Sequence, residues 1–278
     1  MYDILVTSKS FARYNPELID TLKGNGINII RASKSNMSAE DIAQIIPQYD
    51  GIICGIDSIN KGVIQAGDKL KIIHMHGTGV DHIDIDEANI KGVYVGNCPG
   101  ANATAVAELN LAILLAEARG VVKHSKSIYE KKWERNLGVE LSNKVMGVIG
   151  LGYIGRKFVE LLRGFNMRVI AYEPYPNLDW VQKNNVELLE DINQVFSESD
   201  FISLNLPLIE STMNIINKDT IALMKKDVII VNTSRGGLIN TNDLVDAIKN
   251  KTIKGAALDA FTNEPIHWDS ELLNIDLT

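Results

Sequence analysis

Three glycines in the middle of the chain have the spacing and the setting of a phosphate-binding loop. Gly150, Gly152 and Gly155 follow directly after the apolar run Val145–Ile149, and a helical pattern, 156–164, continues from them. In this setting the first glycine permits a tight turn and the second lets backbone N–H groups approach a pyrophosphate. The third allows close contact between helix and strand, and the N-terminus of the helix attracts the anion. The segment predicts a dinucleotide site, and the alternative is that the glycines only form a turn.

An acidic residue ends the next predicted strand. Glu173 follows the apolar run Arg168–Tyr172 and lies 18 residues after Gly155. A carboxylate there can accept hydrogen bonds from the adenosine ribose hydroxyls, and it repels a 2′-phosphate. No Arg or Lys follows it directly, because the next residues are Pro174, Tyr175 and Pro176. The sequence therefore predicts NAD as the cofactor rather than NADP.

Two later strand ends carry charged residues that could act on a substrate. The run Val228–Thr233 leads to Arg235, and an arginine followed by glycines suits capture of a carboxylate through two parallel hydrogen bonds. The next predicted strand is followed by Asp259, which could contact a nicotinamide, and by Glu264, which could orient a histidine and favour its protonated form. The alternatives are a surface arginine in a polar loop and a solvated loop carboxylate.

The elements that position these residues form a regular alternation. Short apolar runs alternate with helical patterns from end to end, as in parallel sheets covered by helices. The predicted fold class is α/β, with a flavodoxin-like lobe over residues 1–99 and a doubly wound Rossmann lobe over residues 100–278. A long helix from about Asn102 to Arg119, extended by a charged stretch to about Glu134, is expected to run between the lobes. The predicted strands are Ile4–Thr7, Ile27–Arg31, Gly51–Cys54, Leu70–His74 and Val93–Val95, then Val145–Ile149, Arg168–Tyr172, Val186–Leu188, Phe201–Leu204, Val228–Thr233 and Ala256–Leu258.

Composition excludes several other classes of protein. The chain has 278 residues, 45% of them apolar, and a net charge of −7, which favours folded domains over disorder. Its most apolar long window, Ala107–Val122, contains charged residues and falls short of the about 20 apolar residues that a bilayer requires. The acidic balance argues against a nucleic-acid partner, which would need clustered Lys and Arg. We therefore expect neither a membrane span nor nucleic-acid binding.

The cysteine content and the N-terminal residues bear on the compartment. Only Cys54 and Cys98 are present, which fits a reduced interior and a cytoplasmic location rather than a disulfide scaffold. The first residues read as a strand without a basic region or cleavage site, so we expect no signal peptide. No spacing of His, Cys, Asp and Glu resembles a metal site.

Taken together, these motifs resemble the D-isomer-specific 2-hydroxyacid dehydrogenase family, which includes phosphoglycerate, lactate, glycerate and hydroxypyruvate enzymes. The resemblance covers essentially the whole sequence. It rests on the segments Gly77–Asp81, Val106–Glu108, Gly150–Gly155, Asn232–Gly236 and Asp259–Pro265, which occur in the family's order. It implies a substrate lobe that a final C-terminal segment completes, and a site in the cleft between the lobes, which closes on the ligands.

The resemblance also assigns roles to single residues. Arg235 would bind the substrate carboxylate and polarise the reacting oxygen, and Glu264 would pair with a catalytic histidine. Thr78 and Gly79 would present backbone N–H groups to the carboxylate. The implied cofactor contacts are Tyr153 and Ile154 at the pyrophosphate, Glu173 at the ribose, Leu206, Pro207 and Thr212 on the adenosine side, and Thr104, Thr233 and Asp259 nearer the nicotinamide.

One residue of the family's pattern is absent. The mechanism requires a proton carrier, and the family places a histidine in a Pro-His pair well beyond the glutamate. Here the chain stops at Thr278, 14 residues after Glu264, and the spacing of His267 matches no family position. We interpret the chain as cut short at its C-terminus. The alternative is a catalytically impaired or non-catalytic NAD-binding protein.

Substrate and partners are predicted from single positions and from the resemblance. Phosphoglycerate enzymes that resemble this chain carry a basic residue two positions before Gly77, where this sequence has Met75. A small D-2-hydroxy acid or 2-oxo acid is therefore favoured, and phosphoglycerate dehydrogenase remains the alternative. His76 is interpreted as shaping the substrate pocket. The family pairs two subunits through the nucleotide lobe, which implies a homodimer.

Overall fold

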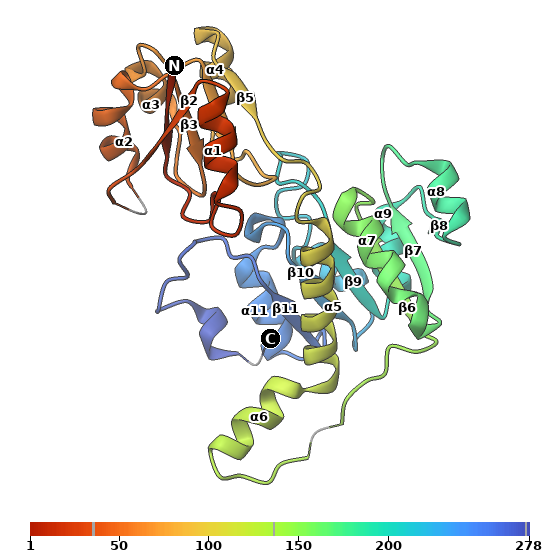
Figure 1. Ribbon diagram of the computed structural model, residues 1–278. Helices are drawn as coiled ribbons and strands as arrows, with labels where there is room; N and C mark the ends of the chain where they lie inside the picture. The colour runs from red at the N-terminus through yellow and green to blue at the C-terminus, as the bar shows by residue number, and fades with distance from the viewer. Residues whose placement is uncertain (35–36, 136, 276) are drawn as a thin grey trace. The chain divides into compact units, whose positions relative to one another are not determined.

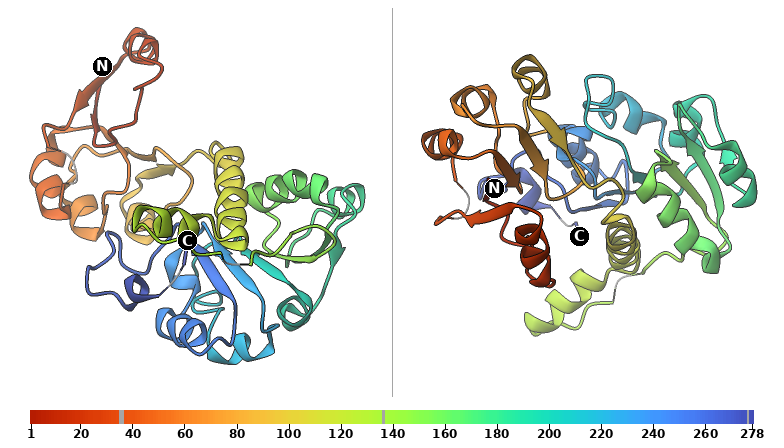
Figure 2. Two further views of the ribbon diagram at one scale, coloured as in Figure 1. Left: turned by 90° about the horizontal axis from the view of Figure 1, so that it is seen from below. Right: turned by 45° about the horizontal axis from the view of Figure 1, so that its top comes forward.

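The structure is a computed structural model that describes residues 1–34, 37–135, 137–275 and 277–278. The chain divides into two compact units, Met1–Asn102 and Ala103–Thr278, close to the predicted division after residue 99. Each unit contains one sheet of parallel strands with helices on its two faces (Figures 1 and 2). The predicted α/β fold class is confirmed.

The first unit has a five-stranded sheet in the order β2-β1-β3-β4-β5, which is the flavodoxin-like order. Two of its five strands have the predicted ends, and the ends of the other three differ by one or two residues; β4, for example, begins at Ile72 rather than Leu70. Its strands are β1 (Tyr2–Val6), β2 (Ile27–Arg31), β3 (Gly51–Cys54), β4 (Ile72–Met75) and β5 (Tyr94–Gly96). Its helices are α1 (Glu17–Gly24), α2 (Ala39–Ile45), α3 (Lys61–Ala66) and α4 (Ile85–Lys91), with a 3-10 turn at Ile46–Gln48.

Helices cover the two faces of this sheet unequally. On one face α1 packs over Val6, Ile29 and Ile53 through its own apolar side chains. On the other, α2, α3 and α4 bury a larger cluster that includes Ile52 and Ile73. Ser38 caps the N-terminus of α2, because its hydroxyl accepts a hydrogen bond from the backbone N–H of Asp41 at 3.1 Å.

The second unit has a six-stranded sheet in the order β11-β10-β9-β6-β7-β8, the doubly wound Rossmann order. All six predicted strands are present in it. They are β6 (Val145–Ile149), β7 (Arg168–Tyr172), β8 (Glu187–Leu188), β9 (Phe201–Leu204), β10 (Ile229–Asn232) and β11 (Gly255–Leu258). The helices are α5 (Ala103–Arg119), α6 (Val121–Tyr129), α7 (Tyr153–Leu161), α8 (Leu178–Lys183), α9 (Ile192–Glu198), α10 (Lys218–Leu223) and α11 (Thr241–Lys249), with 3-10 turns at Leu162–Phe165, Gly236–Leu238 and Glu271–Asn274.

The helix expected from about Asn102 to Arg119 is present as α5, but its expected extension to about Glu134 does not continue the same helix. The helix α5 ends at Arg119, and Gly120 has a φ of 64°, in the left-handed region that ends helices and favours glycine. A separate helix, α6, then continues to Tyr129, and Figure 1 shows it turned away from the axis of α5. Neither helix, nor any other in the described part of the chain, is long and apolar enough to cross a bilayer.

Alternating side chains of the second sheet form two cores. Met146 and Val148 belong to a cluster beneath α5, α7 and α8. Ile149 belongs to the opposite cluster, which α9, α10 and α11 cover with side chains such as Phe196 and Leu244. The near-continuous apolar strand sequences follow from this, because a parallel sheet is buried on both faces.

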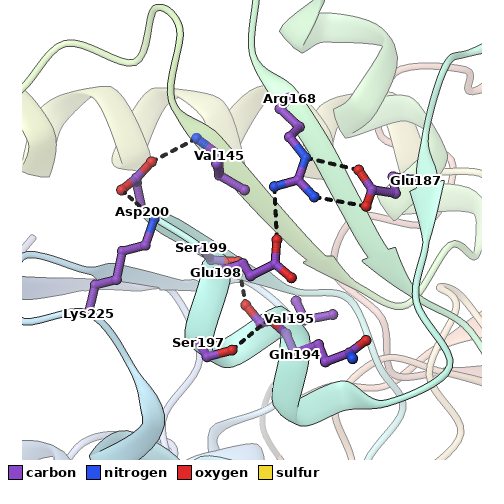
Figure 3. A network of polar contacts seen from close by, with 10 residues as sticks. All are labelled: Val145, Arg168, Glu187, Gln194, Val195, Ser197, Glu198, Ser199, Asp200 and Lys225. Atoms are coloured by element: carbon purple, nitrogen blue, oxygen red, sulfur yellow. Dashed lines mark hydrogen bonds and ion pairs between the residues drawn. The ribbon is translucent and has the colours of Figure 1, made fainter.

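Charged side chains bind the amino ends of these strands to one another. Arg168, at the start of β7, donates two hydrogen bonds to Glu187 and one to Glu198, each 2.8–2.9 Å long (Figure 3). Directly before β9, Asp200 accepts from the backbone N–H of Val145 at 2.8 Å and from Lys225 at 3.0 Å. Burial opposes ionisation of Asp200, but these two donors hold its pKa below its usual range.

One glycine inside β6 allows α9 to approach the sheet. A Cβ atom on Gly147 would overlap the Ser199 hydroxyl and lie 2.8 Å from a methyl group of Val195. That hydroxyl is buried and donates to the Val195 carbonyl at 2.6 Å, so it has no room to move (Figure 3). The absence of a side chain at this position therefore sets how closely helix and sheet pack.

We expect Gly147→Ala to lower the free energy of unfolding by about 1–3 kcal/mol, because the added methyl group overpacks this contact. Urea denaturation monitored by circular dichroism measures the change. Gly164→Ala is the matched control, since no atom lies within 4 Å of a Cβ there and its backbone is not in the left-handed region. Equal midpoints for the two variants would contradict the role given to Gly147.

Candidate active site

The carboxyl ends of the second sheet gather most of the predicted site residues. Loops leave this edge after β6, β7, β9, β10 and β11, and in a doubly wound fold ligands bind outside it. Seven predicted sites follow strands at this edge: the glycine loop, Glu173, Leu206, Pro207, Thr233, Arg235 and Asp259. Of the others in this unit, Thr212 lies further along the β9 loop, Thr104 in the first turn of α5, and Glu264 in the segment after β11.

Packing of the chain itself requires the first and third glycines of the loop. Gly150 has a φ of 96°, and a Cβ there would overlap the carbonyl oxygen of Asn205. A Cβ on Gly155 would overlap the carbonyl oxygen of Gly150, so α7 starts in direct contact with the turn. These two positions therefore tolerate no side chain, whether or not a ligand is bound.

The second glycine behaves differently. No atom lies within 4 Å of a Cβ built on Gly152, so its lack of a side chain is not required by the protein's own packing. Gly152 is also the N-cap of α7, where no side chain caps the helix and the first-turn N–H groups at Tyr153 and Ile154 have no partner within the helix. Open space beside unpaired N–H groups fits a pyrophosphate.

Glu173 bridges the loops that follow β6 and β7. Its carboxylate accepts a hydrogen bond from the backbone N–H of Leu151 at 2.8 Å and another from that of Tyr175 at 3.1 Å. A carboxylate has about four acceptor positions, so two ribose hydroxyls could still donate to it. The residue therefore fixes the glycine loop and keeps the capacity to bind a ribose.

The loop after β9 is held by the Thr212 side chain. Its hydroxyl donates to the carbonyl oxygen of Pro207 at 2.7 Å and accepts from the backbone N–H of Ile209 at 2.9 Å. At the start of this loop, a methyl group of Leu206 lies 3.1 Å from the position of a Cβ on Gly150. The predicted adenosine-side residues thus form one ordered loop beside the glycine turn.

A buried amide shapes the turn that carries Arg235. Asn232 donates to the carbonyl oxygen of Arg235 at 2.8 Å and accepts from the backbone N–H of Ser234 at 3.0 Å. The Ser234 hydroxyl donates to the carbonyl oxygen of Leu204 at 2.9 Å, and Arg235 itself donates through Nη1 to the Ser234 carbonyl at 2.8 Å. Sequence reasoning gave Asn232 no role, although an amide that ends an otherwise apolar strand was the available signal.

The two predicted catalytic segments of this unit meet. A Cβ on Gly236 would overlap the backbone of Phe261, so the turn after Arg235 lies directly against the segment that contains Asp259 and Glu264. Glu264 is exposed and accepts a hydrogen bond from the backbone N–H of Phe261 at 3.0 Å. Partial burial, together with the negative charge of Glu264, raises the pKa of Asp259.

Thr233 has a buried hydroxyl with no hydrogen-bond partner in the described structure. Such groups are uncommon in folded proteins, because burying a hydroxyl without a partner costs free energy. The residue directly follows β10 and precedes the Arg235 turn, at the edge of the sheet that bears the glycine loop. An unpaired donor here fits a ligand group such as a nicotinamide amide.

A second polar cluster, also missed from the sequence, links α5 to this edge. Asn110 is fully buried and donates to the Ser203 hydroxyl at 2.7 Å. Asn205 donates to the same hydroxyl at 3.0 Å, and its backbone lies against Gly150. The cluster therefore fixes the chain that lies next to the phosphate loop.

In the first unit, the loop after β4 contains Thr78 and Gly79. Asn97 donates to the Thr78 carbonyl at 2.7 Å, and the Thr78 hydroxyl donates to the side chain of Asn102 at 2.9 Å. Among the described residues, the backbone N–H groups of Thr78 and Gly79 donate no hydrogen bond. Two adjacent unpaired donors in a braced loop are suited to a carboxylate.

Metal ligands and an alternative catalytic histidine were also sought among the described residues. No group of three or more His, Cys, Asp and Glu residues there could hold a metal ion. His267, the histidine nearest Glu264 in sequence, is exposed. The catalytic histidine expected from the resemblance has no counterpart in the sequence at the family's spacing.

Comparisons with known proteins identify the family. Residues 111–278 match the family described as "D-isomer specific 2-hydroxyacid dehydrogenase, NAD binding domain". D-3-phosphoglycerate dehydrogenase of Methanocaldococcus jannaschii is 40% identical over 245 residues, which cover 87% of this chain and 47% of that protein. Hydroxypyruvate reductase of Thermotoga maritima is 38% identical over 264 residues, covering 91% of this chain and 85% of that protein.

A solved structure agrees with these matches. Glyoxylate reductase from Paecilomyes thermophila superposes with a TM-score of 0.84 at 26% identity, covering 98% of this chain and 85% of the other. Several curated phosphoglycerate dehydrogenases that the chain matches are about twice as long, since it spans 47–49% of their length. The family match extends over more than half of the chain and includes the glycine loop, the Arg235 turn and the Asp259–Glu264 segment. The chain belongs to the D-isomer specific 2-hydroxyacid dehydrogenase family.

Proposed function

We propose that the protein is an NAD-dependent oxidoreductase that transfers hydride between the nicotinamide and a small D-2-hydroxy acid or its 2-oxo acid. The observation that carries the proposal is the contact between the Arg235–Gly236 turn and the Phe261 backbone. This contact brings a carboxylate-binding side chain and two acidic residues to the sheet edge that also bears the phosphate loop. Bound NAD supplies the hydride acceptor, and the protein supplies binding, orientation and proton transfer.

The chain's own residues have separate parts in this proposal. Arg235 binds the substrate carboxylate and polarises the oxygen on C2. In the first unit, the backbone N–H groups of Thr78 and Gly79 are proposed to bind a carboxylate. Glu264 pairs with a catalytic histidine at a family position that this sequence does not include. Glu264 is exposed, and Phe261 donates to only one of its carboxylate oxygens, so the other oxygen can accept from an imidazole.

The cofactor contacts proposed in the second unit follow the open side of the glycine loop. Gly152, Tyr153 and Ile154 hold the pyrophosphate through backbone N–H groups, and Glu173 binds the adenosine ribose. Preference for NAD over NADP follows from Glu173, whose negative charge would repel a 2′-phosphate. The remaining proposed contacts are Gly150, Gly155, Leu206, Pro207 and Thr212 towards the adenosine half, and Thr104, Thr233 and Asp259 towards the nicotinamide.

We expect Gly152→Ala to weaken NADH binding by about tenfold or more, because a methyl group would enter the space proposed for the pyrophosphate. The unfolding midpoint should not change, since no atom lies within 4 Å of the added carbon and the φ of −67° suits alanine. Isothermal titration calorimetry measures the affinity, with Gly164→Ala as the control. Unchanged affinity in Gly152→Ala would contradict the proposed cofactor site.

The proposed substrate class is a small acid without a phosphate. In the first unit, β3 ends with Cys54 and β4 ends with Met75, and neither side chain carries a charge. Burial raises the pKa of the Cys54 thiol to about 12. The hydroxypyruvate reductase relative supports this class, and its length is nearly covered by the match. The phosphoglycerate dehydrogenase relatives support the alternative, that the substrate is phosphorylated.

Turnover tests the activity. NADH absorbance is followed with glyoxylate, hydroxypyruvate, pyruvate and 3-phosphohydroxypyruvate, using this chain and a version extended toward the family's full length. In the form that turns over, we expect Arg235→Ala to lower kcat/KM by about 10²-fold or more, because a charged, paired contact to the reacting acid is lost. Arg235→Lys should recover part of this loss, since it keeps the charge without the planar fork.

Arg163→Ala is the matched control for that experiment. Arg163 is exposed and donates to Asn184, away from the strand ends that carry the site. Wild-type kinetics in Arg235→Ala would overturn the assignment. Tight NADH binding without turnover of any acid would favour the second candidate, a non-catalytic NAD-binding protein.

A homodimer through the second unit is part of the proposal. The helix α6 and the segment after it expose several large apolar side chains to solvent, an arrangement typical of subunit interfaces. The exposed apolar residues are Val121, Val122, Ile128, Tyr129, Trp133 and Leu137.

Two further parts of the proposal rest on composition. The acidic net charge argues against nucleic acid as a partner, and the two unpaired cysteines favour the cytoplasm.

We expect light scattering of the purified chain to give twice the mass of one chain, and Tyr129→Asp to give the mass of one. A charge buried at an interface without a partner costs enough to dissociate a small contact. Tyr14→Asp is the matched control, since Tyr14 is 87% exposed and Tyr129 is 85% exposed. A wild-type chain of monomer mass, or a dimeric Tyr129→Asp, would contradict this interface.

A further inference from the structure

A histidine in the first unit is held by two serines that are distant from it in sequence. Ser8 and Ser10 follow β1, and their hydroxyl oxygens lie 3.0 and 3.2 Å from Nδ1 of His76, which follows β4. The two hydroxyls are 3.2 Å from each other, and the ring of Phe11 meets the imidazole edge-on, with the ring centroids 5.6 Å apart. Four residues from two strand ends therefore form one cluster around the imidazole.

Neighbouring contacts make this cluster rigid. The Thr7 hydroxyl donates to the carboxylate of Asp57 at 2.6 Å, and the same carboxylate accepts from the backbone N–H of Gly55 at 3.2 Å. The backbone N–H of His76 donates to the carbonyl oxygen of Cys54 at 2.9 Å. The ends of β1, β3 and β4 are thus joined, and the orientation of the imidazole follows from the positions of all three.

The two ring nitrogens of His76 are in different situations. Both serines engage Nδ1, whereas Nε2 makes no hydrogen bond with any described residue. His76 is only partly buried, so Nε2 does not carry the cost of a fully buried unpaired atom. An imidazole fixed through one nitrogen and open at the other is arranged to contact a ligand.

The position of His76 relative to the proposed carboxylate site limits what it can reach. Thr78 is two residues further along the chain, and two residues span at most about 7 Å. A three-carbon acid whose carboxylate lies on the N–H groups of Thr78 and Gly79 therefore has its third carbon within reach of His76. The nearest strand-end side chains, Cys54 and Met75, carry no charge with which to bind a phosphate.

We propose that His76 is a specificity-determining residue that hydrogen-bonds a hydroxyl group on C3 of the substrate through Nε2. The inference rests on the proposed function and narrows its substrate class to glycerate and hydroxypyruvate. A hydroxyl group suits either tautomer of the ring, because it both donates and accepts. A methyl group does neither, and a fully ionised phosphate ester offers no proton to an unprotonated Nε2.

The test uses complexes that cannot react. NADH and a 2-hydroxy acid are both reduced, so D-glycerate, D-lactate and 3-phospho-D-glycerate can be titrated into NADH-saturated, ¹⁵N-labelled protein and followed by NMR. D-lactate has the carbon skeleton of D-glycerate without the hydroxyl on C3. In the wild-type chain we expect D-glycerate to bind about tenfold more tightly than D-lactate, and more tightly than the phosphate ester.

Substitutions assign this preference to the cluster. In His76→Phe we expect the ratio of the two affinities to fall to about one while D-lactate binds as before, because the proposed contact to the C3 hydroxyl is removed and D-lactate has no such hydroxyl. Ser10→Ala, at an exposed position, should lower the ratio partly, and it carries the test if His76→Phe does not fold. Lys9→Met is the matched control, since Lys9 lies between the two serines and is not among the described hydrogen-bond partners of the imidazole.

The outcomes separate this inference from the proposed function. Equal binding of D-lactate and D-glycerate to the wild-type chain, or a ratio that persists in His76→Phe, overturns the role of His76 and leaves the proposed function standing. If 3-phospho-D-glycerate binds more tightly than D-glycerate and this preference is lost in Lys9→Met, the role of His76 is overturned in favour of a phosphate site. NADH binding without binding of any acid overturns both the inference and the proposed substrate class.

Discussion

The arrangement of the second unit depends on one close contact, that between Gly155 and the carbonyl oxygen of Gly150. Because no Cβ fits between them, α7 begins directly against the turn that leaves β6. This contact sets the direction of the helix and therefore the direction of its unpaired first-turn N–H groups. Asn205 lies beside both glycines, so the end of β9 is placed by the same contact. The open space at Gly152 results from this packing and not from a loose loop.

Buried polar side chains then hold the loops at the carboxyl ends of the strands. At these ends the sheet's ladder of hydrogen bonds stops, and the backbone groups that follow require other partners. Asn232 supplies both a donor and an acceptor to the turn after β10, and Asn110 and Asn205 both donate to the hydroxyl of Ser203 in β9. A buried amide with these bonds permits few alternative loop conformations, because each alternative would leave a buried polar atom without a partner. The candidate site is rigid for this reason, before any ligand is considered.

The sequence predicted the features that depend on local pattern, and it missed those that depend on contacts between distant segments. Both strand orders agree with the predicted lobes, because apolar runs and glycine spacing are local signals. The helix break at Gly120 was missed because apolar residues continue on both sides of it, and a single glycine costs a helix only about 1 kcal/mol. The Ser8–Ser10–His76 cluster could not be predicted, since no periodicity relates residues 66 and 68 positions apart. The role of Asn232 was missed although its contacts are local, with residues two and three positions further along the chain. The functions assigned to Arg235, Glu264 and the cofactor contacts remain predictions, which the geometry supports.

Charged and uncharged candidate residues are divided between the two units. Arg235, Asp259 and Glu264 belong to the second unit, together with the phosphate loop, and their charges suit steps that every member of the family would share. The candidates of the first unit are the backbone N–H groups of Thr78 and Gly79 and the cluster of two serines and a histidine, and the side chains that end β3 and β4, Cys54 and Met75, carry no charge. Substitutions at these strand ends can change which acid binds without disturbing the glycine loop, because each sheet holds its own loops through its own buried contacts. Differences in substrate among relatives with similar second units are therefore expected to arise at the carboxyl ends of β1, β3 and β4.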